Sequence, residues 1–122
     1  MNPTREQIQW VWEKCGFTEV PKYGGSDYSE ILWRSPIGSH SESLPLIDLN
    51  NLFKYAVPKL EGKYDLDVSD DSELLGKSVC FHSITNRECS AASPIEFFRT
   101  WDEFYLALFC AIYKAFQNEQ KF

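Results

Sequence analysis

The C-terminal segment constrains the fold of this chain most strongly, because its pattern predicts one long helix that is apolar around much of its circumference. Thr100 and Glu103 have the spacing of a capping box, and the stretch 93–96 (Ser-Pro-Ile-Glu) offers an alternative start. A helix with so wide an apolar surface is expected to be covered on more than one side. The stripe consists of Phe104, Tyr105, Leu108, Ala111, Ile112 and Ala115, widened by Trp101, Phe109, Tyr113 and Phe116.

Two further helices are predicted in the N-terminal half. Thr4 and Gln7 form a capping box before apolar residues that recur at helical spacing, and Gly16 can end that helix in a left-handed conformation. Asp48 can cap a second helix with an almost unbroken apolar stripe. Pro58 is expected to end or kink this second helix, because proline lacks the N–H that the helix needs.

Strands are predicted mainly between the second and the last helix. Residues 64–69 alternate between apolar and polar side chains, residues 79–82 do the same, and a third strand is expected at about 87–92. A short strand is also predicted at 28–33. The polar stretch 35–43, rich in serine, predicts a mobile surface loop.

The order of these elements predicts an α+β fold. We expect a small antiparallel sheet of three or four strands with two or three helices packed against it. With 122 residues, the chain has the length of a single domain, 1–122, and it shows no internal repeat.

The charge pattern argues against nucleic acid as a partner. The formal charge is −6, and the 12 basic residues are spread along the chain instead of clustering. A basic protein or a cationic small molecule would suit this charge, although the charge also simply favours solubility. The longest apolar run, 106–112, is too short to cross a membrane, and the first residues lack the apolar stretch of a signal peptide. We therefore predict a cytoplasmic protein with no membrane contact.

The cysteines give little support for a metal or a disulfide. Cys15, Cys80, Cys89 and Cys110 contain no C-x-x-C pair, and only Cys80 and Cys89 are placed to face each other across a hairpin. His82 adds a third ligand type there, but a structural zinc site needs four ligands. We predict no metal and no cofactor, and leave open whether Cys80 and Cys89 pair or bind a metal.

Two other patterns resemble functional motifs and fail in detail. The acidic run from Asp65 to Glu73 lacks the glycine and the glutamate that an EF-hand loop requires at its sixth and twelfth positions. The stretch 38–41 (Gly-Ser-His-Ser) places hydroxyls beside an imidazole, but it lacks the G-x-S-x-G elbow, and neighbours in sequence do not form a catalytic geometry. No phosphate-binding loop is present either. The sequence therefore predicts a protein that is not an enzyme.

The aromatic residues are the unusual feature of the composition, with 4 Trp, 6 Tyr and 9 Phe. Several of these rings fall off the core stripes, where aromatic residues favour protein interfaces or stacked ligands, although a small core filled with large rings explains the excess equally well. We expect a non-enzymatic interaction protein that binds another protein, with a small-ligand-binding or sequestering protein as the alternative. The candidate binding residues are Trp10, Tyr28, Trp33 and Tyr64.

A resemblance to known proteins rests on two segments. Residues 44–52 (Leu-Pro-Leu-Ile-Asp-Leu-Asn-Asn-Leu) form a loop that enters an amphipathic helix, and residues 89–94 (Cys-Ser-Ala-Ala-Ser-Pro) lead into the closing apolar run that ends at Phe116. This layout resembles small phage and prophage proteins of the alpha-beta-alpha sandwich type over roughly half to two-thirds of the chain. The chain departs from that pattern at Pro58 and at the polar step 99–103. The resemblance implies no activity, so it transfers no catalytic residue.

Overall fold

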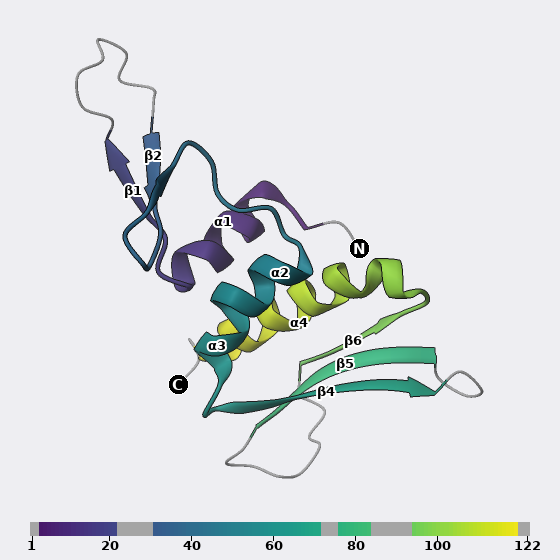
Figure 1. Cartoon of the computed structure of the whole chain (residues 1–122). Helices are drawn as coiled ribbons and strands as arrows, with labels where there is room; N and C mark the ends of the chain where they lie inside the picture. The colour runs from purple at the N-terminus through teal and green to yellow at the C-terminus, as the bar shows by residue number, and fades with distance from the viewer. Residues whose placement is uncertain (1–2, 22–30, 72–75, 84–93, 120–122) are drawn as a thin grey trace.

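The computed structural model describes residues 3–21, 31–71, 76–83 and 94–119 of the chain (Figure 1). It confirms the α+β fold class: helices pack with two separate three-stranded antiparallel sheets. The sequence predicted only one sheet, so the second sheet is a new feature.

The first helix, α1 (Arg5–Lys14), forms as predicted. Its capping box is complete, because the Gln7 amide donates to the Thr4 hydroxyl at 3.2 Å and the Thr4 amide donates to the Gln7 side chain at 2.9 Å. Gly16 follows the helix with a φ of 107°, a conformation that glycine adopts without strain.

A small sheet contains the strands β1 (Thr18–Pro21), β2 (Ile31–Arg34) and β3 (His40–Ser41), in that order. Strand β2 contains residues 31–33 of the strand predicted at 28–33 and continues to Arg34, and residues 28–30 lie outside the described residues. The prediction of a plain loop over 35–43 is wrong in part, because residues 40 and 41 pair with β2. Backbone pairing to a neighbouring strand, which a composition rich in serine does not reveal, orders this stretch.

The second helical segment is continuous but changes its winding. It comprises α2 (Leu49–Asn51), a π-helical stretch η1 (Leu52–Ala56) and α3 (Val57–Leu60). Asp48 caps it as predicted, accepting a hydrogen bond from the Asn51 amide at 2.8 Å. Pro58 lies in the last turn of this segment, which ends at Leu60, and the π-helical stretch η1 directly precedes α3. The helix therefore changes its winding next to the proline, which supplies no N–H for a regular helical hydrogen bond.

The larger sheet contains the strands β4 (Tyr64–Asp71), β5 (Gly76–Ser83) and β6 (Ile95–Phe98) in sequence order. Its first two strands are those predicted around 64–69 and 79–82, whereas β6 was not predicted as a strand. The strand expected at 87–92 lies outside the described residues. A helix start at 93–96 is wrong, because Ile95 is the register partner of Cys80 on β5 and the chain there is extended. Strand pairing has overridden a local capping signal.

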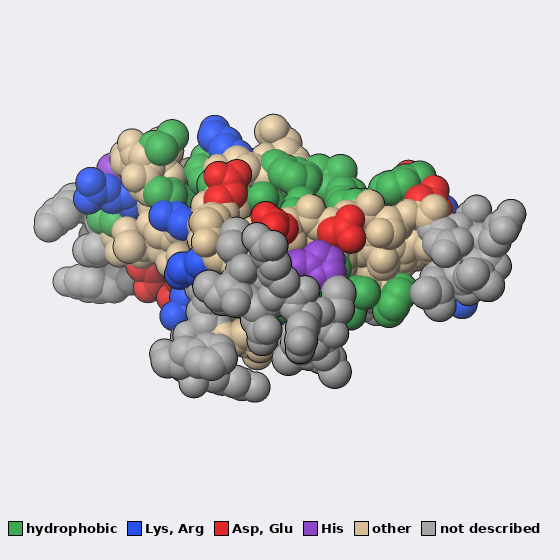
Figure 2. Space-filling model, turned by 90° about the horizontal axis from the view of Figure 1, so that it is seen from below, with side chains coloured by type: hydrophobic (Ala, Val, Ile, Leu, Met, Phe, Trp, Pro, Cys, Tyr) green, Lys and Arg blue, Asp and Glu red, His purple; other side chains and the backbone are tan. Residues whose placement is uncertain are grey.

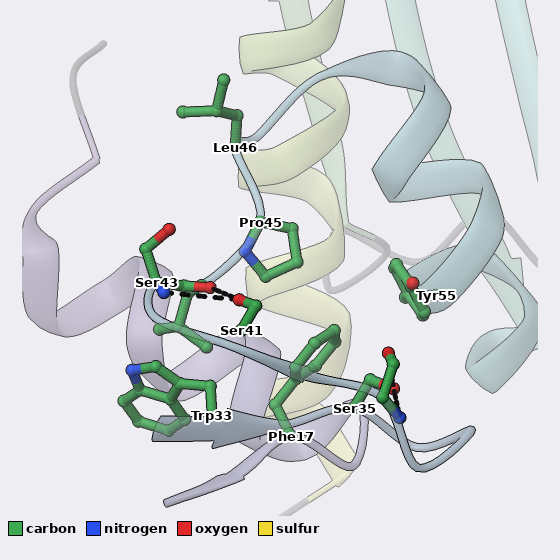
Figure 3. Close-up of a pocket in the computed structure, with 10 residues that line it drawn as sticks. Phe17, Trp33, Ser35, Ser41, Ser43, Pro45, Leu46 and Tyr55 are labelled. Carbon is green, nitrogen blue, oxygen red and sulfur yellow. Dashed lines mark hydrogen bonds between the residues drawn. The ribbon is translucent and has the colours of Figure 1, made fainter. Parts of the chain in front are cut away.

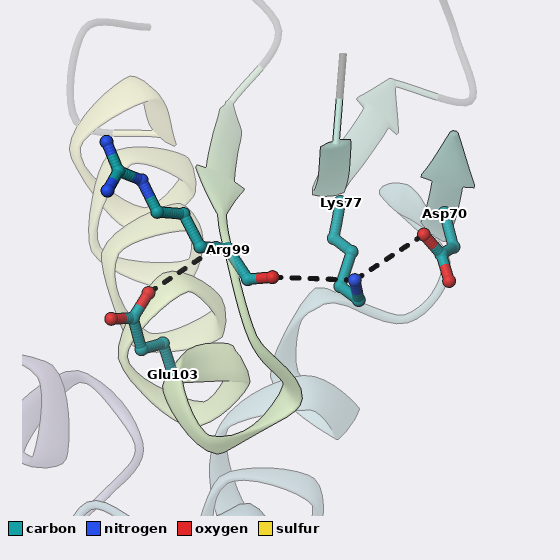
Figure 4. A network of polar contacts seen from close by, with 4 residues as sticks. All are labelled: Asp70, Lys77, Arg99 and Glu103. Carbon is teal, nitrogen blue, oxygen red and sulfur yellow. Dashed lines mark hydrogen bonds and ion pairs between the residues drawn. The ribbon is translucent and has the colours of Figure 1, made fainter. Parts of the chain in front are cut away.

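The last helix, α4 (Phe104–Glu119), begins after a short 3-10 turn, η2 (Trp101–Glu103). The predicted capping box does not form, since the Thr100 side chain makes no capping hydrogen bond. The Glu103 carboxylate instead accepts from the Arg99 amide at 3.4 Å, while the Arg99 carbonyl accepts from the Lys77 ammonium (Figure 4). Lys77 also pairs with Asp70 at 3.7 Å, so this polar network joins β4, β5 and the start of the last helix.

Helix α4 is the centre of the fold, as its apolar pattern predicted. It packs on β5 and β6 on one side and contacts α1 and η1 on the other, so Leu108, Ala111, Ile112 and Ala115 are fully buried. Figure 1 shows all four labelled helices on one side of the β4–β6 sheet. The alpha-beta-alpha layering that the resemblance implied would place helices on both sides, and the described part of the chain does not show that arrangement. None of the helices in this part combines the length and the apolar character needed to cross a membrane.

Candidate functional site

A hollow of about 270 Å³ lies between the small sheet and the second helical segment. Its aromatic lining comes from three separate places in the chain: Phe17 after α1, Trp33 on β2 and Tyr55 on η1. Figure 3 shows these rings around the segment that carries Pro45, with Leu46 pointing away from them. We call this site the serine hollow, because its remaining lining includes Ser35, Ser39, Ser41 and Ser43, besides residues 44–46.

The hairpin between β2 and β3 brings the serines to the site. The Gly38 amide donates to the Ser35 carbonyl at 3.0 Å and the Ser35 amide donates to the Ser39 carbonyl at 2.8 Å, which closes a tight turn. Pro36 favours the first bend of this turn, and Gly38 supplies a φ of 93°. Beyond the turn, serines alternate with His40 and Glu42; the chain is extended at residues 40 and 41 and bends at 42 and 43. The serines at 39, 41 and 43 all line the hollow.

The serine hydroxyls form two local pairs. Ser35 and Ser39 join their hydroxyl oxygens at 2.7 Å, and the Ser39 amide donates to the Ser35 hydroxyl at 3.0 Å. The Ser41 hydroxyl donates to the Ser43 carbonyl and accepts from the Ser43 amide at 3.3 Å. A serine hydroxyl has one proton and two lone pairs, so these bonds leave hydrogen-bonding capacity in both pairs.

The aromatic floor of the hollow is rigidly supported. The rings of Phe17 and Tyr55 meet edge to face with centroids 5.0 Å apart, and Trp12 contacts both rings from the core. The Trp12 indole N–H donates to the Pro45 carbonyl at 3.0 Å, which ties the segment 44–46 to α1. Because Trp12 is fully buried, this hydrogen bond joins the wall of the hollow to the protein core.

None of the described residues that line the serine hollow is Asp, Glu, Lys, Arg or His. This part of the lining is therefore uncharged, although the chain carries a formal charge of −6. At its border, Leu46 is 79% exposed, and Leu49 and Phe53 on the adjoining helical segment are also exposed. An uncharged recess beside exposed apolar side chains can hold an uncharged group and exclude water around it.

The structure places the predicted binding residues in different environments. Trp33 lines the serine hollow. Trp10 packs edge to face on Tyr113 of α4 at 5.2 Å, so it contributes to the interface between two helices. Tyr64 contacts Phe81 across β4 and β5 at 6.3 Å. Tyr28 lies outside the described residues.

The motif at 38–41 is arranged differently from a catalytic centre. The hydroxyl of Ser39 bonds to the hydroxyl of Ser35, and the hydroxyl of Ser41 bonds to the backbone of Ser43. His40 lies between Ser39 and Ser41 in the sequence. In the described structure neither serine hydroxyl is paired with the His40 imidazole.

A second group of polar side chains lies on the face of the large sheet opposite α4. The Sγ atom of Cys80 is 3.9 Å from Nδ1 of His82, and Nε2 of His82 is 3.4 Å from a carboxylate oxygen of Asp67. Figure 2 views the molecule from below and shows acidic side chains beside a histidine. Asp70 points to the other face, toward Lys77, so strand alternation divides the acidic run. Within the described ranges, no three His, Cys, Asp or Glu residues are arranged to hold a metal ion.

The thiols of Cys15 and Cys110 are free. Burial raises the pKa of Cys15 to about 12, and burial is also the main cause of a raised pKa at Cys110. Both thiols therefore stay protonated at neutral pH and are poor nucleophiles. Cys89 is outside the described residues, so its pairing with Cys80 stays a prediction.

The sequence reasoning selected Trp33 but missed the other residues of the serine hollow. The available signal was the alternation of serines at 39, 41 and 43, which is typical of a strand with one small polar face. Phe17 and Tyr55 carry no such signal, because tertiary packing alone brings the ends of two different helices together.

Comparison of the chain with protein-family models, curated proteins and solved structures finds no match. The resemblance to small phage and prophage proteins stays a prediction.

Proposed function

We propose that this chain is a non-enzymatic binding protein whose partner is another protein, and that the serine hollow with its exposed border is the contact surface. The observation that carries the proposal is the neutral, ring-lined recess with the highly exposed Leu46 at its edge. Protein interfaces concentrate their binding energy in such recesses, where a side chain of the partner is fully desolvated.

The charge of the chain supports a partner with a basic surface. The formal charge of −6 attracts cationic proteins and speeds their encounter, while the uncharged hollow supplies the desolvated centre of the contact. The free thiols of Cys15 and Cys110 fit a reducing compartment, and we propose a cytoplasmic location.

A selection of random displayed peptides against the purified chain tests this proposal. Peptides that bind the wild-type chain should lose at least tenfold in affinity on Leu46→Asp, because that change places a charge at the border of the contact. The control is Ile37→Asp, which alters another highly exposed apolar residue that does not line the hollow. A selection that yields no specific binder, or binders indifferent to Leu46→Asp, would contradict the proposal.

The size of the serine hollow and the position of Trp33 favour one alternative, a small-ligand-binding protein. A volume of about 270 Å³ approaches the lower limit of ~300 Å³ for common ligand pockets. A thermal-shift screen against metabolites distinguishes the two functions. A ligand at about 100 times its dissociation constant should stabilise the chain by about 2.7 kcal/mol.

A further inference from the structure

We infer that the serine hollow receives one tyrosine side chain of the partner protein, an inference that rests on the proposed function. The anchors that dominate protein interfaces are mostly tryptophan, tyrosine and arginine. The chemistry of the hollow discriminates among these three side chains.

Arginine is disfavoured because none of the described lining residues carries a carboxylate. A guanidinium group keeps its charge when it is buried, so it needs an acidic partner or dense hydrogen bonding to offset the loss of water. Asp65 and Asp67 lie on β4 in the other sheet, where they can attract a basic partner from a distance. Glu42 lies between Ser41 and Ser43 in the sequence but does not itself line the hollow.

An aromatic ring matches the floor of the hollow. Phe17 and Tyr55 already meet edge to face at 5.0 Å, and Trp33 offers a further ring at another part of the lining. A ring inserted among these residues can adopt the edge-to-face and offset contacts that aromatic groups prefer. The volume of about 270 Å³ suits a single side chain better than a longer segment of chain.

The serine hydroxyls favour a phenol over a plain phenyl ring and over an indole. The Ser35–Ser39 hydroxyl pair keeps one free proton and free lone pairs, so it can both donate and accept. The Ser41 hydroxyl, whose proton goes to the Ser43 carbonyl, keeps one lone pair and can only accept. A phenol both donates and accepts hydrogen bonds, whereas an indole only donates and a phenyl ring does neither. Burying these hydroxyls under a phenyl ring would leave polar groups without partners, which is unfavourable.

The test uses N-acetyl-tyrosinamide, with the phenylalanine, tryptophan and arginine analogues as matched probes. Binding to the full ¹⁵N-labelled chain is measured by NMR titration. We expect the tyrosine probe to shift the indole signal of Trp33 and the amides of Ser39 and Ser41, and to bind roughly two- to tenfold more tightly than the phenylalanine probe, the range that one hydrogen bond supplies.

Two variants separate the ring contact from the hydroxyl contact. Trp33→Leu should weaken both the tyrosine and the phenylalanine probe, while the control Trp101→Leu, at an exposed tryptophan that does not line the hollow, should change neither. Ser39→Ala or Ser41→Ala should remove the preference for tyrosine without weakening the binding of the phenylalanine probe. Retained binding of that probe shows that the variant is folded.

The outcomes for the inference and for the proposed function are distinguishable. The inference is overturned if the tryptophan or arginine probe binds more tightly than the tyrosine probe, or if the preference for tyrosine survives both serine variants. Neither result contradicts the proposed binding of a protein partner. Binding of the tyrosine probe in the hollow without any peptide binder supports the phenol site but contradicts a protein partner. Shifts that map away from the hollow overturn the inference outright.

Discussion

Replacing Trp12 with phenylalanine is expected to destabilise the chain and to loosen one wall of the serine hollow. Trp12 is fully buried, contacts the rings of Phe17 and Tyr55, and donates its indole N–H to the Pro45 carbonyl at 3.0 Å. The substitution removes this donor and leaves a void where the larger ring was. Together the unpaired carbonyl and the void should lower the free energy of unfolding by about 2 to 4 kcal/mol.

Urea unfolding followed by circular dichroism measures this loss, with Trp101→Phe as the matched control. Trp101 is 52% exposed, so the same chemical change there should alter the free energy of unfolding by less than about 1 kcal/mol. Hydrogen exchange gives an independent check. The Asp48 amide, which donates to the Leu46 carbonyl at 3.0 Å, should exchange faster in Trp12→Phe than the global loss of stability accounts for. Equal effects of the two substitutions on stability would refute the reasoning.

Three further predictions concern stability and pH. Gly16→Ala should lower the free energy of unfolding more than Gly38→Ala. Both glycines have positive φ, but a Cβ atom at Gly16 would lie 3.2 Å from the side chain of Pro36, whereas nothing lies within 4 Å of a Cβ atom at Gly38. Equal losses in urea unfolding would argue against that close contact. Asp48→Ala should cost about 1 kcal/mol in the same assay, because it removes the cap of the second helical segment, and a neutral result would mean that the cap is redundant. Burial raises the pKa of Cys15 from 9.0 to about 12, so the unfolded chain releases this proton first and stability should fall as pH rises from 9 toward 12. Between pH 8 and pH 10.5, the titration of Cys15 should lower the free energy of unfolding by about 2 kcal/mol. The variant Cys15→Ala keeps the other titrating groups, so it should lack this part of the decline.

The elements predicted correctly are those whose signals are local and dense. The capping box of α1, the cap at Asp48 and the alternation along β4 and β5 each lie within a few residues, and each forms as the spacing predicts. The wide apolar stripe of α4 also correctly predicted coverage on two sides. Such signals survive in the fold because local preference and tertiary packing agree.

The errors lie where two local signals compete or where a short strand depends on its neighbour. The stretch 93–96 carries a good helix-start pattern, yet residues 95–98 form the strand β6 beside β5. Thr100 and Glu103 have capping-box spacing, but the carboxylate of Glu103 accepts from Arg99 instead. In both places, contacts made by residues distant in sequence outweigh a preference worth about 1 kcal/mol.

The sequence by itself determined the class of the fold and the identity of its central helix, because burial of a long apolar surface is dictated by residue type and spacing. Only the tertiary structure decided where a binding site lies. Phe17, Trp33 and Tyr55 come from three elements that meet across the hairpin of serines, and no local pattern relates their positions. The packing of α1 and η1 against α4 determines where these elements meet. The hollow remains because the side chains of these elements do not fill the space between them completely.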